Sequence, residues 1–427
     1  TNTGAKGGRR MKRIGMFVWN PFTNDARVLR ECTALVEAGH RVDLYCLNDS
    51  TLPEVEYPMS GFRVIRIDRT PPFARWLPFF RKRKKRTLVI GVIGALLAPW
   101  LIPVMLVLFL LMRSRFIRYA LYNSFGILRM TRTARKHDYD VMHANDVNTL
   151  PQAIGAARGA QIVYDSHEVQ TDRTGYGSMQ GKLERWLLRF VDQTIVENDT
   201  RADYHQKLYG TRPSVLHNYP FYEPIVPQPR PLREELALAP DEPILLYQGG
   251  IQEGRGLERL IEAMPFIDRG TLIFVGDGKL KGKLMQLAAQ SSEKSRIRFI
   301  EKVPLAELPS YTAAATVGFQ VLQNVCFNHY SASSNKLFEY MAALIPVIAA
   351  DLPEIRRVVE TEGVGLIVDV ESPQSIAEAV NRLVKDENLR RAMQERASVA
   401  RRQYNWEQEK GRLLAVYDSI FMESGAK

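Results

Sequence analysis

The chain has 427 residues, with 58 Lys and Arg against 47 Asp and Glu, which gives a net charge of +11. This length accommodates two or three domains, each with a full hydrophobic core. Fifteen of the basic residues and no acidic residue lie between Arg69 and His137, so the rest of the chain sums to −4 (11 minus 15). Because the positive charge is confined to one segment, the composition argues against a nucleic-acid-binding protein. The three cysteines show no metal-ligand spacing and give no disulfide framework.

Strand and helix patterns alternate through the first half of the chain. Short apolar runs predict strands at 13–19, 41–47, 62–67, 141–143, 162–164 and 194–196. A helical pattern at 26–38 separates the first two strands. Such alternation implies βαβ units and a parallel sheet. We therefore predict an N-terminal Rossmann-like domain over residues 11–225.

An apolar segment interrupts this domain. Residues 88–112 contain no charged side chain in 25 positions, and basic residues crowd both ends, at 81–86 and 113–118. The segment is long enough to cross a bilayer. However, Pro99 and Pro103 stand in its middle, where each removes a backbone donor and bends or breaks a helix. Each remaining piece is about ten residues long, or about half the hydrocarbon thickness.

The position of the apolar segment constrains its topology. Strands on both sides belong to one predicted domain, so both ends of the segment must lie on the same face of a membrane. Positive charge on both flanks suits two ends at one anionic leaflet. We therefore predict that residues 70–123 form a re-entrant or interfacial helical hairpin, which would make the protein monotopic at the cytoplasmic face of the inner membrane. A buried helical hairpin or an oligomer contact is the alternative.

A proline-rich linker at 220–240 precedes a second series of alternating elements. Apolar runs predict strands at 244–248, 272–275, 297–299, 317–321 and 346–349. We predict a second Rossmann-like, doubly wound domain over 240–404, facing a cleft shared with the first domain. The helix expected at 406–422 would complete the first domain. Ligands of such sheets bind outside the carboxyl ends of the strands.

Two glycine-rich loops follow predicted strands of the second domain. In the first, Gly249 and Gly250 let the backbone approach a ligand, and Arg255 adds a cation beside a helix N-terminus, which favours phosphate. An ordinary strand-to-helix turn is the alternative. In the second loop, Gly276 precedes Asp277, which would accept from a ligand hydroxyl or simply cap the next helix. The turn interpretation is favoured for this loop.

A polar stretch before the helix at 335–343 is the strongest site signal. Ser333, Ser334, Asn335 and Lys336 offer hydroxyls, backbone N–H groups and a cation to an anion. Glu339, one turn later, would bind a diol. An ordinary solvated helix residue is an equal alternative for Glu339.

Polar side chains also follow strands of the first domain. His167 lies in the sequence Tyr-Asp-Ser-His-Glu directly after an apolar strand, where sites form, although a structural histidine is the alternative. Asp25 and Arg27 would line the acceptor side or merely cap and decorate a helix. The same two interpretations apply to Asp146 and Asn148.

Several of these stretches resemble the retaining GT-B glycosyltransferases of family 4. Residues 333–357 (SSNKLFEYMAALIPVIAADLPEIRR) closely resemble the donor-site segment, and so do 249–263 and 274–278. The opening DARVLREC…EAGHRVDLYCL is similar as well. YDSHE at 164–168 and VLHNYP at 215–220 match the N-domain loop and the domain junction of one branch. The resemblance covers the chain from Met11 to about residue 420, except the insert.

The resemblance implies a role for individual residues. Arg255 would contact the donor diphosphate together with Lys336, and Glu339 would bind the nucleotide ribose. His167 would lie near the transferred sugar, and Asn218 at the interdomain hinge. The implied catalytic residues are His167, Arg255 and Lys336. The implied donor-binding residues are Gly249, Gly250, Arg255, Gly276, Asp277, Ser333, Ser334, Asn335, Lys336 and Glu339.

The chain departs from the family pattern at two positions. The first acid of the E-x7-E pattern would fall on Ser331, and one basic residue of the family's phosphate clamp is here Gly250. His329, Tyr330 or Ser331 would have to replace the missing acid, and the sequence does not choose among them.

The resemblance implies a membrane-associated retaining glycosyltransferase. It would move a sugar from a nucleotide diphosphate sugar to a lipid-linked or membrane-proximal glycan acceptor, as in polysaccharide biosynthesis. The sequence has no Asp-x-Asp-like pair on a suitable loop, so we expect neither metal nor cofactor. The expected partners are the nucleotide sugar, the acceptor and an anionic leaflet, and no nucleic acid. The alternatives are a catalytically weak scaffold of a polysaccharide assembly and a nucleotide-sugar epimerase of the same fold.

Overall fold

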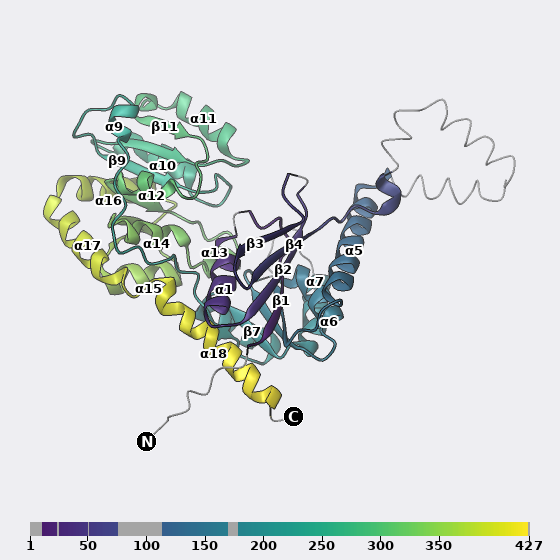
Figure 1. Ribbon diagram of the computed structural model, residues 1–427. Coiled ribbons are helices and arrows are strands. Elements are labelled where there is room, and N and C mark those ends of the chain that lie inside the picture. Colours follow the sequence, from purple (N-terminus) through teal and green to yellow (C-terminus); the bar gives the residue numbers. More distant parts are fainter. Residues whose placement is uncertain (1–10, 24, 50, 76–112, 170–177, 426–427) are drawn as a thin grey trace, which may run out of the picture. The chain divides into compact units, whose positions relative to one another are not determined.

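The computed structural model describes residues 11–23, 25–49, 51–75, 113–169 and 178–425 (Figure 1). The apolar segment 88–112 and the hairpin predicted around it therefore lie largely outside the described residues. The chain divides into two compact units. The first unit comprises residues 1–166, 184–194 and 420–427, and the second comprises 167–183 and 195–419.

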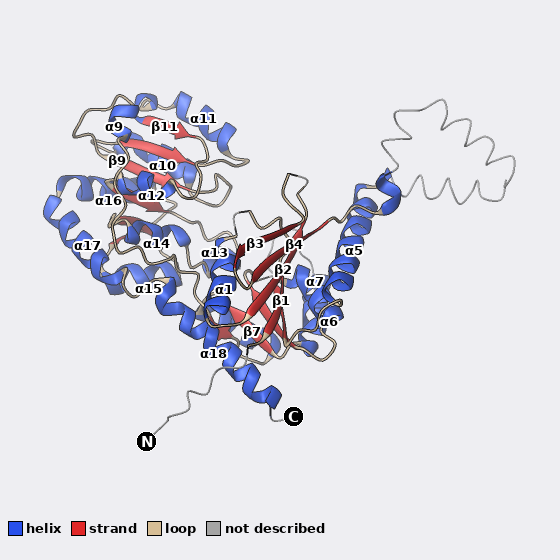
Figure 2. Cartoon of the chain, in the orientation of Figure 1, coloured by secondary structure: helices blue, strands red, loops and turns tan. Residues whose placement is uncertain are grey.

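Each of two sheets carries helices against its strands (Figure 2). The first sheet has eight strands in the order β3-β4-β2-β1-β5-β6-β7-β8. Their bounds are β1 (Arg13–Phe17), β2 (Arg41–Leu47), β3 (Val55–Met59), β4 (Phe62–Ile67), β5 (Val141–Asn145), β6 (Gln161–Ser166), β7 (Gln193–Val196) and β8 (Ser214–Val215). The pairs β1–β2, β1–β5, β2–β4 and β5–β6 are parallel, which confirms the predicted kind of sheet.

The edge strand β3 was not predicted from the sequence. It pairs antiparallel with β4, with an irregular register between Glu56 and Met59. Its side chains are mostly exposed, and Pro58 interrupts the run. An exposed strand shows no continuous apolar pattern, and proline is tolerated mainly at sheet edges, so the usual signal was missing.

Helices connect the strands of the first sheet. They are α1 (Ala26–Glu37), α5 (Arg115–Ala134), α6 (Leu150–Ala156), α7 (Ser178–Leu187) and α8 (Asp199–Tyr209). In α5, the Ser114 hydroxyl caps the first turn by accepting from the Ile117 N–H, and Met130 is fully buried in the core beside the sheet. The N-terminal turns differ, because Phe116 is 78% exposed and Tyr119 is 64% exposed. The helix thus begins as an aromatic, basic surface and ends as core.

The second sheet has six strands in the order β11-β10-β9-β12-β13-β14, and neighbouring strands pair in parallel. The strands are β9 (Ile244–Gln248), β10 (Thr271–Val275), β11 (Ile297–Ile300), β12 (Val317–Gln320), β13 (Val347–Ala350) and β14 (Gly365–Val368). Numbered within the sheet, this is the doubly wound order 3-2-1-4-5-6, whose direction reverses between β9 and β12. The prediction of two Rossmann-like sheets is confirmed.

Further helices lie before, between and after the strands of the second sheet. They are α9 (Leu232–Glu235), α10 (Leu257–Ala263), α11 (Lys281–Gln290), α12 (Leu308–Ala313), α13 (Phe327–Tyr330), α14 (Asn335–Ala342), α15 (Pro353–Glu362), α16 (Pro373–Lys385), α17 (Glu387–Ala400) and α18 (Trp406–Gly425). Tyr340 of α14 is fully buried and donates to the Leu246 carbonyl at 3.0 Å. A Cβ on Gly318 would lie 2.5 Å from the Tyr340 ring, so this strand position needs glycine.

The last helix is anchored by polar contacts at its start. The Trp406 N–H donates to the Pro220 carbonyl at 2.7 Å, and the Glu409 carboxylate accepts from both the backbone N–H and the ring Nδ1 of His217. Burial acts to raise the pKa of Glu409, but the hydrogen bonds from His217 outweigh it and lower that pKa. The His217 ring stacks on Tyr219 at 4.8 Å.

One finding concerns helices that could cross a membrane. Within the ranges that the structure describes, no helix combines the length and the apolar character needed to cross a bilayer. The predicted hairpin at 70–123 falls mostly in the undescribed stretch 76–112, so it remains a prediction.

Candidate functional site

A cavity of about 560 Å³ lies in the second unit, where β9 and β12 end. It is lined by His167, Glu168, Glu197, Arg201, Gln252, Arg255, Gln320, Leu322, Cys326, Asn328, His329, Ala332, Ser333, Ser334, Asn335 and Lys336. Gln320 is the last residue of β12, and Gln252 and Arg255 lie in the loop after β9. The cavity therefore sits where the strand order reverses, as expected for a doubly wound sheet.

The structure brings six of the predicted site residues to this cavity: His167, Arg255, Ser333, Ser334, Asn335 and Lys336. They come from three stretches of the sequence, and the first and last of these are more than 160 positions apart. The cavity wall does not include Gly249, Gly250, Gly276, Asp277 or Glu339.

The two glycine-rich loops lie backbone against backbone. The Gly249 N–H donates to the Val275 carbonyl, and the Ile251 N–H donates to the Asp277 carbonyl, both at 2.9 Å. A Cβ on Gly276 would lie 2.0 Å from the Gly249 oxygen, and Gly276 has φ +150°. Only glycine permits this approach. Gly276 therefore shapes the loop that carries Gly249, rather than facing the cavity.

Asp277 behaves as a turn residue. Its side chain is exposed, and Oδ1 accepts from the N–H of Gly278 at 2.8 Å. This contact agrees with the turn that was favoured from the sequence. A ligand-binding role for Asp277 has no support from the cavity wall.

Lys336 is the unusual cation of the site. Its Nζ lies 5.4 Å from the centre of the Tyr247 ring and 3.7 Å from where a Gly249 Cβ would stand. Burial, together with the nearby charge of Arg255, lowers the pKa of Lys336 to about 7. Glu339 opposes this shift without cancelling it. Near neutral pH the ammonium is therefore readily lost or regained.

Lys336 lies in the first turn of α14. The Ser334 side chain makes no capping hydrogen bond at this helix end, so it does not occupy the free N–H groups of the first turn. Asn335 is tied down by accepting from the Asn218 amide at 3.1 Å. With Arg255 on the same cavity, two cations and a helix N-terminus converge, which is the arrangement that binds a diphosphate.

Glu339 is neither fully exposed nor isolated. Its Oε2 accepts from the side-chain amide of Gln248 at 2.6 Å, and the side-chain oxygen Oε1 of Gln248 accepts from the Thr312 hydroxyl at 2.7 Å. Gln248 is the buried last residue of β9. An ordinary solvated helix residue would have no such connection, so the structure favours a fixed carboxylate one turn beyond the helix start.

The histidines face the cavity differently. The Nδ1 of His329 lies 3.0 Å from the Gln323 carbonyl, which can only accept, so Nδ1 carries the proton and Nε2 is an acceptor. Burial lowers the pKa of His329, which keeps this ring neutral near pH 7. His167 lines the cavity, and its backbone carbonyl accepts from Arg201.

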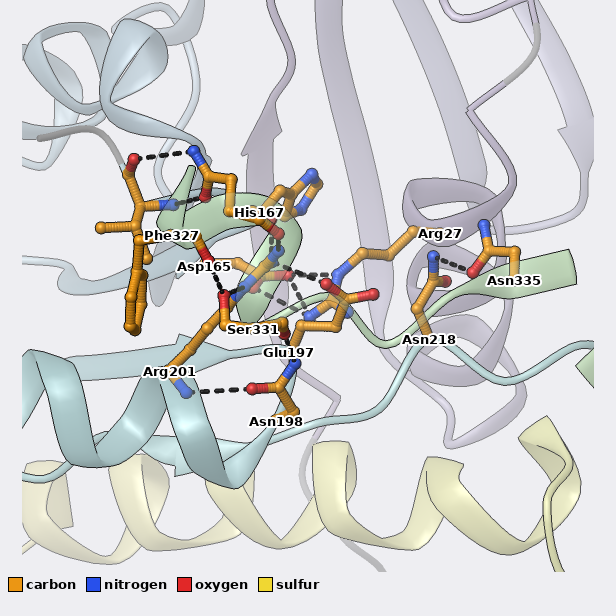
Figure 3. Close-up of polar contacts among 12 residues, drawn as sticks. Arg27, Asp165, His167, Glu197, Asn198, Arg201, Asn218, Phe327, Ser331 and Asn335 are labelled. Atoms are coloured by element: carbon orange, nitrogen blue, oxygen red, sulfur yellow. Dashed lines mark hydrogen bonds and ion pairs between the residues drawn. The ribbon is translucent and has the colours of Figure 1, made fainter. Parts of the chain in front are cut away.

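Residues missed by the sequence reasoning surround Ser331 (Figure 3). Arg201 of α8 donates through Nε to the Ser331 hydroxyl at 3.2 Å and through Nη1 to the Glu197 carboxylate at 2.6 Å. The Asn198 amide donates to the Ser331 carbonyl at 2.7 Å. Glu197 follows the last residue of β7, so the strand-end rule that found His167 would also have found Glu197.

Of the candidate residues in the first unit, Arg27 belongs to a buried ion-pair group. Arg27 binds both oxygens of Asp165 at 2.9 Å, and its Nε lies 3.0 Å from the Glu31 carboxylate. Asp25 caps α1 by accepting from the Val28 N–H at 3.2 Å. For Asp25 and Arg27 the structural interpretation therefore accounts for the contacts seen.

Within the described residues, Glu31, His143 and Asp165 place their ligand atoms within 4.8 Å of one another. All three are fully buried. Arg27 forms ion pairs with both carboxylates, so positive charge from the protein already lies inside this group. Asp146 directly follows β5. It has φ +64°, and its side chain makes no capping hydrogen bond to the turn that follows.

Two family models match consecutive parts of the chain. Residues 25–218 match the glycosyl transferase 4-like domain, and residues 230–399 match the domain described as glycosyl transferases group 1.

Curated relatives are similar at a moderate level. D-inositol 3-phosphate glycosyltransferase from Xylanimonas cellulosilytica is 26% identical over 255 residues, which is 56% of this chain and 60% of that protein. Phosphatidyl-myo-inositol mannosyltransferase from Mycobacterium leprae is 26% identical over 310 residues, 70% of this chain and 78% of that protein. The chain thus spans less than two thirds of the first of these relatives.

Solved structures share the fold along nearly the whole chain. Sucrose-phosphate synthase from Thermosynechococcus elongatus has a TM-score of 0.72 and 18% identity, covering 96% of this chain and 100% of its own. HepE from Anabaena, solved with UDP-glucose, has a TM-score of 0.69 and 17% identity over the same shares. The chain is therefore similar to these two domain models over consecutive stretches, and it shares the fold of these solved structures.

Proposed function

We propose that this protein is a retaining glycosyltransferase that takes its sugar from a nucleotide diphosphate sugar and adds it to a lipid-linked or membrane-proximal glycan acceptor. The observation that carries the donor half is the meeting of Arg255, Lys336 and the N-terminus of α14 on one cavity. A leaving diphosphate gains negative charge in the transition state, and preorganised cations and helix N–H groups stabilise that charge.

Five residues on the donor cavity and Glu339 beside it have defined tasks in this proposal. Arg255 and Lys336 bind the diphosphate, and Ser333 and Ser334 supply backbone N–H groups and hydroxyls to it. Glu339, fixed by Gln248, accepts from the ribose hydroxyls. His167 stands near the transferred sugar. Retention without an enzymic nucleophile then follows a front-face path, in which the departing phosphate helps to deprotonate the acceptor hydroxyl.

The proposal needs no metal ion. Two cations already lie on the donor cavity, so the charge that a divalent ion would contribute in other transferases has a substitute here. Transfer measured with excess chelator tests this point, and unchanged turnover is the expected result. A chelator-sensitive rate restored by Mg²⁺ or Mn²⁺ would contradict it.

Two observations support a membrane-proximal acceptor. The relatives named above act on an inositol phosphate and on phosphatidyl-myo-inositol, according to their names. In this chain, α5 starts with exposed Phe116 and Tyr119 among arginines, a surface suited to the interface of an anionic leaflet. We propose that this helix and the predicted hairpin at 70–123 hold the protein on the cytoplasmic face of the inner membrane as a monotopic protein.

The first experiment is a donor panel. Purified protein is incubated with UDP-, GDP- and ADP-sugars and membrane extract, and released nucleotide and labelled lipid are measured. Transfer from one donor class with retention of the anomeric configuration is the expected result. Donor binding without any release or transfer would instead favour the scaffold alternative, and interconversion of the free nucleotide sugar would favour the epimerase.

A deletion tests the membrane proposal separately. Removal of residues 75–118 should abolish flotation with vesicles of anionic phospholipid while nucleotide-sugar binding stays within about twofold of the full chain, since the donor cavity lies in the second unit. The matched control replaces only the basic run 81–86 by Ser, which should weaken flotation in a salt-dependent manner. Undiminished flotation of the deletion variant would refute the assignment.

A further inference from the structure

The proposed donor cavity lacks a carboxylate at position 331, where the family pattern has one. Ser331 cannot replace it. Its side chain is fully buried, its hydroxyl donates to the Phe327 carbonyl at 2.8 Å, and it accepts from Arg201 at 3.2 Å. The hydroxyl proton and one acceptor position are thus used inside the protein, and Ser331 does not belong to the cavity wall. Ser331 therefore presents no group to a ligand in the cavity.

The neighbouring candidates are no better placed. His329 donates its Nδ1 proton to the Gln323 carbonyl and is neutral, so it offers a single uncharged acceptor. Tyr330 is 38% exposed and does not belong to the cavity wall. Neither residue supplies the negative charge that makes hydrogen bonds from sugar hydroxyls strong.

Two acids do line the cavity, Glu168 and Glu197. Glu197 comes from the carboxyl end of β7, directly before Asn198, which caps α8 by accepting from the Arg201 N–H at 2.9 Å. The cap fixes the start of the helix, and Arg201 in its first turn reaches back to the Glu197 carboxylate, which lies just before the cap. The Glu197 side chain is only 14% exposed.

Arg201 holds this carboxylate in a single orientation. The guanidinium is buried and binds the Ser331 hydroxyl, the His167 carbonyl and Oε2 of Glu197 (Figure 3). Within the part of the chain that the structure describes, Oε1 of Glu197 takes part in no hydrogen bond. One oxygen is therefore used for positioning, and the other remains available at a polar cavity wall.

The charge of Glu197 selects what it can meet. A carboxylate repels the diphosphate, so it belongs beside the uncharged part of the donor, while Arg255 and Lys336 take the phosphates. Hydroxyl groups are the donors that a nucleotide sugar offers there. We propose that Glu197, positioned by Arg201, accepts hydrogen bonds from hydroxyls of the transferred sugar and so replaces the acid missing at position 331. This inference rests on the proposed donor site.

The test separates the sugar from the nucleotide. Binding of UDP, GDP, UDP-glucose and GDP-mannose is measured by calorimetry for the wild type, Glu197→Gln and Glu168→Gln. Glu197→Gln should weaken the bound sugar nucleotide about 10- to 100-fold, as expected when a charged acceptor becomes neutral, and leave the parent diphosphate within about twofold. Glu168→Gln is the matched control from the same wall and should change both ligands by less than about threefold.

The outcomes distinguish the inference from the proposed function. Equal binding of the sugar nucleotide by wild type and Glu197→Gln overturns the role of Glu197, and so does an equal loss for diphosphate and sugar nucleotide, which marks a structural effect. A selective loss in Glu168→Gln alone assigns the contact to Glu168 instead. Absence of all four ligands from the wild type defeats the donor site itself. If Glu197→Gln does not fold, Glu197→Asp decides, because its shortened carboxylate must give the same selective loss.

Discussion

Donor binding should take up a proton through Lys336. Burial and the charge of Arg255 lower the pKa of this lysine to about 7 in the free protein. A bound diphosphate places two negative charges beside the ammonium and raises its pKa far above that value. The complex therefore holds the charged lysine, whereas the free protein loses the proton as the pH rises through about 7.

The size of the effect follows from the pKa of about 7 of Lys336. The dissociation constant of a nucleotide sugar should scale with one plus ten to the power of pH minus 7, which gives a rise of about 50-fold between pH 7 and pH 9. At pH 8 the binding reaction should take up about 0.9 proton, because about nine tenths of the free protein has lost it. The phosphates of a nucleotide sugar are diesters and do not titrate in this range, so they add nothing to the slope.

The assay is calorimetry at pH 6, 7, 8 and 9 in pairs of buffers that differ in ionisation enthalpy, with the donor identified by the panel. Lys336→Met is the control, with weaker binding at pH 6 and no pH dependence above it. Lys336 should also make the free energy of unfolding rise with pH between about 7 and 10.5, since the unfolded chain binds the extra proton there. A dissociation constant that is flat from pH 7 to 9, or equal heats in both buffers, would refute the reasoning.

Three further predictions follow from the same contacts. Arg255→Ala should reduce kcat/KM by a factor equivalent to about 2–4 kcal/mol, measured by initial rates, because a charge-assisted contact to the leaving diphosphate is lost; unchanged kinetics would place the phosphate site elsewhere. Glu339→Gln should raise the donor KM more than it lowers kcat, since ribose contacts are equal in ground and transition states; a KM within about twofold of wild type would remove Glu339 from the site. Glu409→Gln should cost about 1–3 kcal/mol of unfolding free energy near pH 7 in urea titrations. The lowered pKa of Glu409 means that the wild type loses this advantage as the pH falls below about 4.5, so equal pH slopes of the two proteins would contradict the assignment.

The sequence predicted the part of the site that depends on strand ends and glycine loops. Arg255 was found in a glycine-rich loop that follows a buried strand and opens a helix, and Lys336 in a polar stretch that opens a helix. The topology adds what the pattern lacked, namely that β9 and β12 are neighbours at the reversal of strand order. Their loops must then share one cavity, although they are separated by some 80 residues of chain.

The sequence could not show which polar residues serve packing and which face the ligand. The resemblance implied a ligand contact at Gly276, but its missing side chain makes room for the Gly249 carbonyl. Arg201 was not singled out, because its partners Ser331 and the His167 carbonyl are 130 and 34 positions away. Side-chain pairings over such separations leave no periodic signal, so only the folded chain shows them.

The two departures from the family pattern have different physical consequences. Ser331 lacks the carboxylate of the family pattern, but Arg201 binds both Ser331 and Glu197, and Glu197 lines the cavity. At Gly250 nothing in the packing requires glycine, because a Cβ there would meet only the Gln252 side chain at 3.7 Å. A cation at that position would stand one residue from Gly249, which lies against Lys336, and would lower the pKa of Lys336 further. Under the proposed function, Gly250 leaves Arg255 and Lys336 to bind the diphosphate, and Lys336 should become fully charged only when the diphosphate arrives.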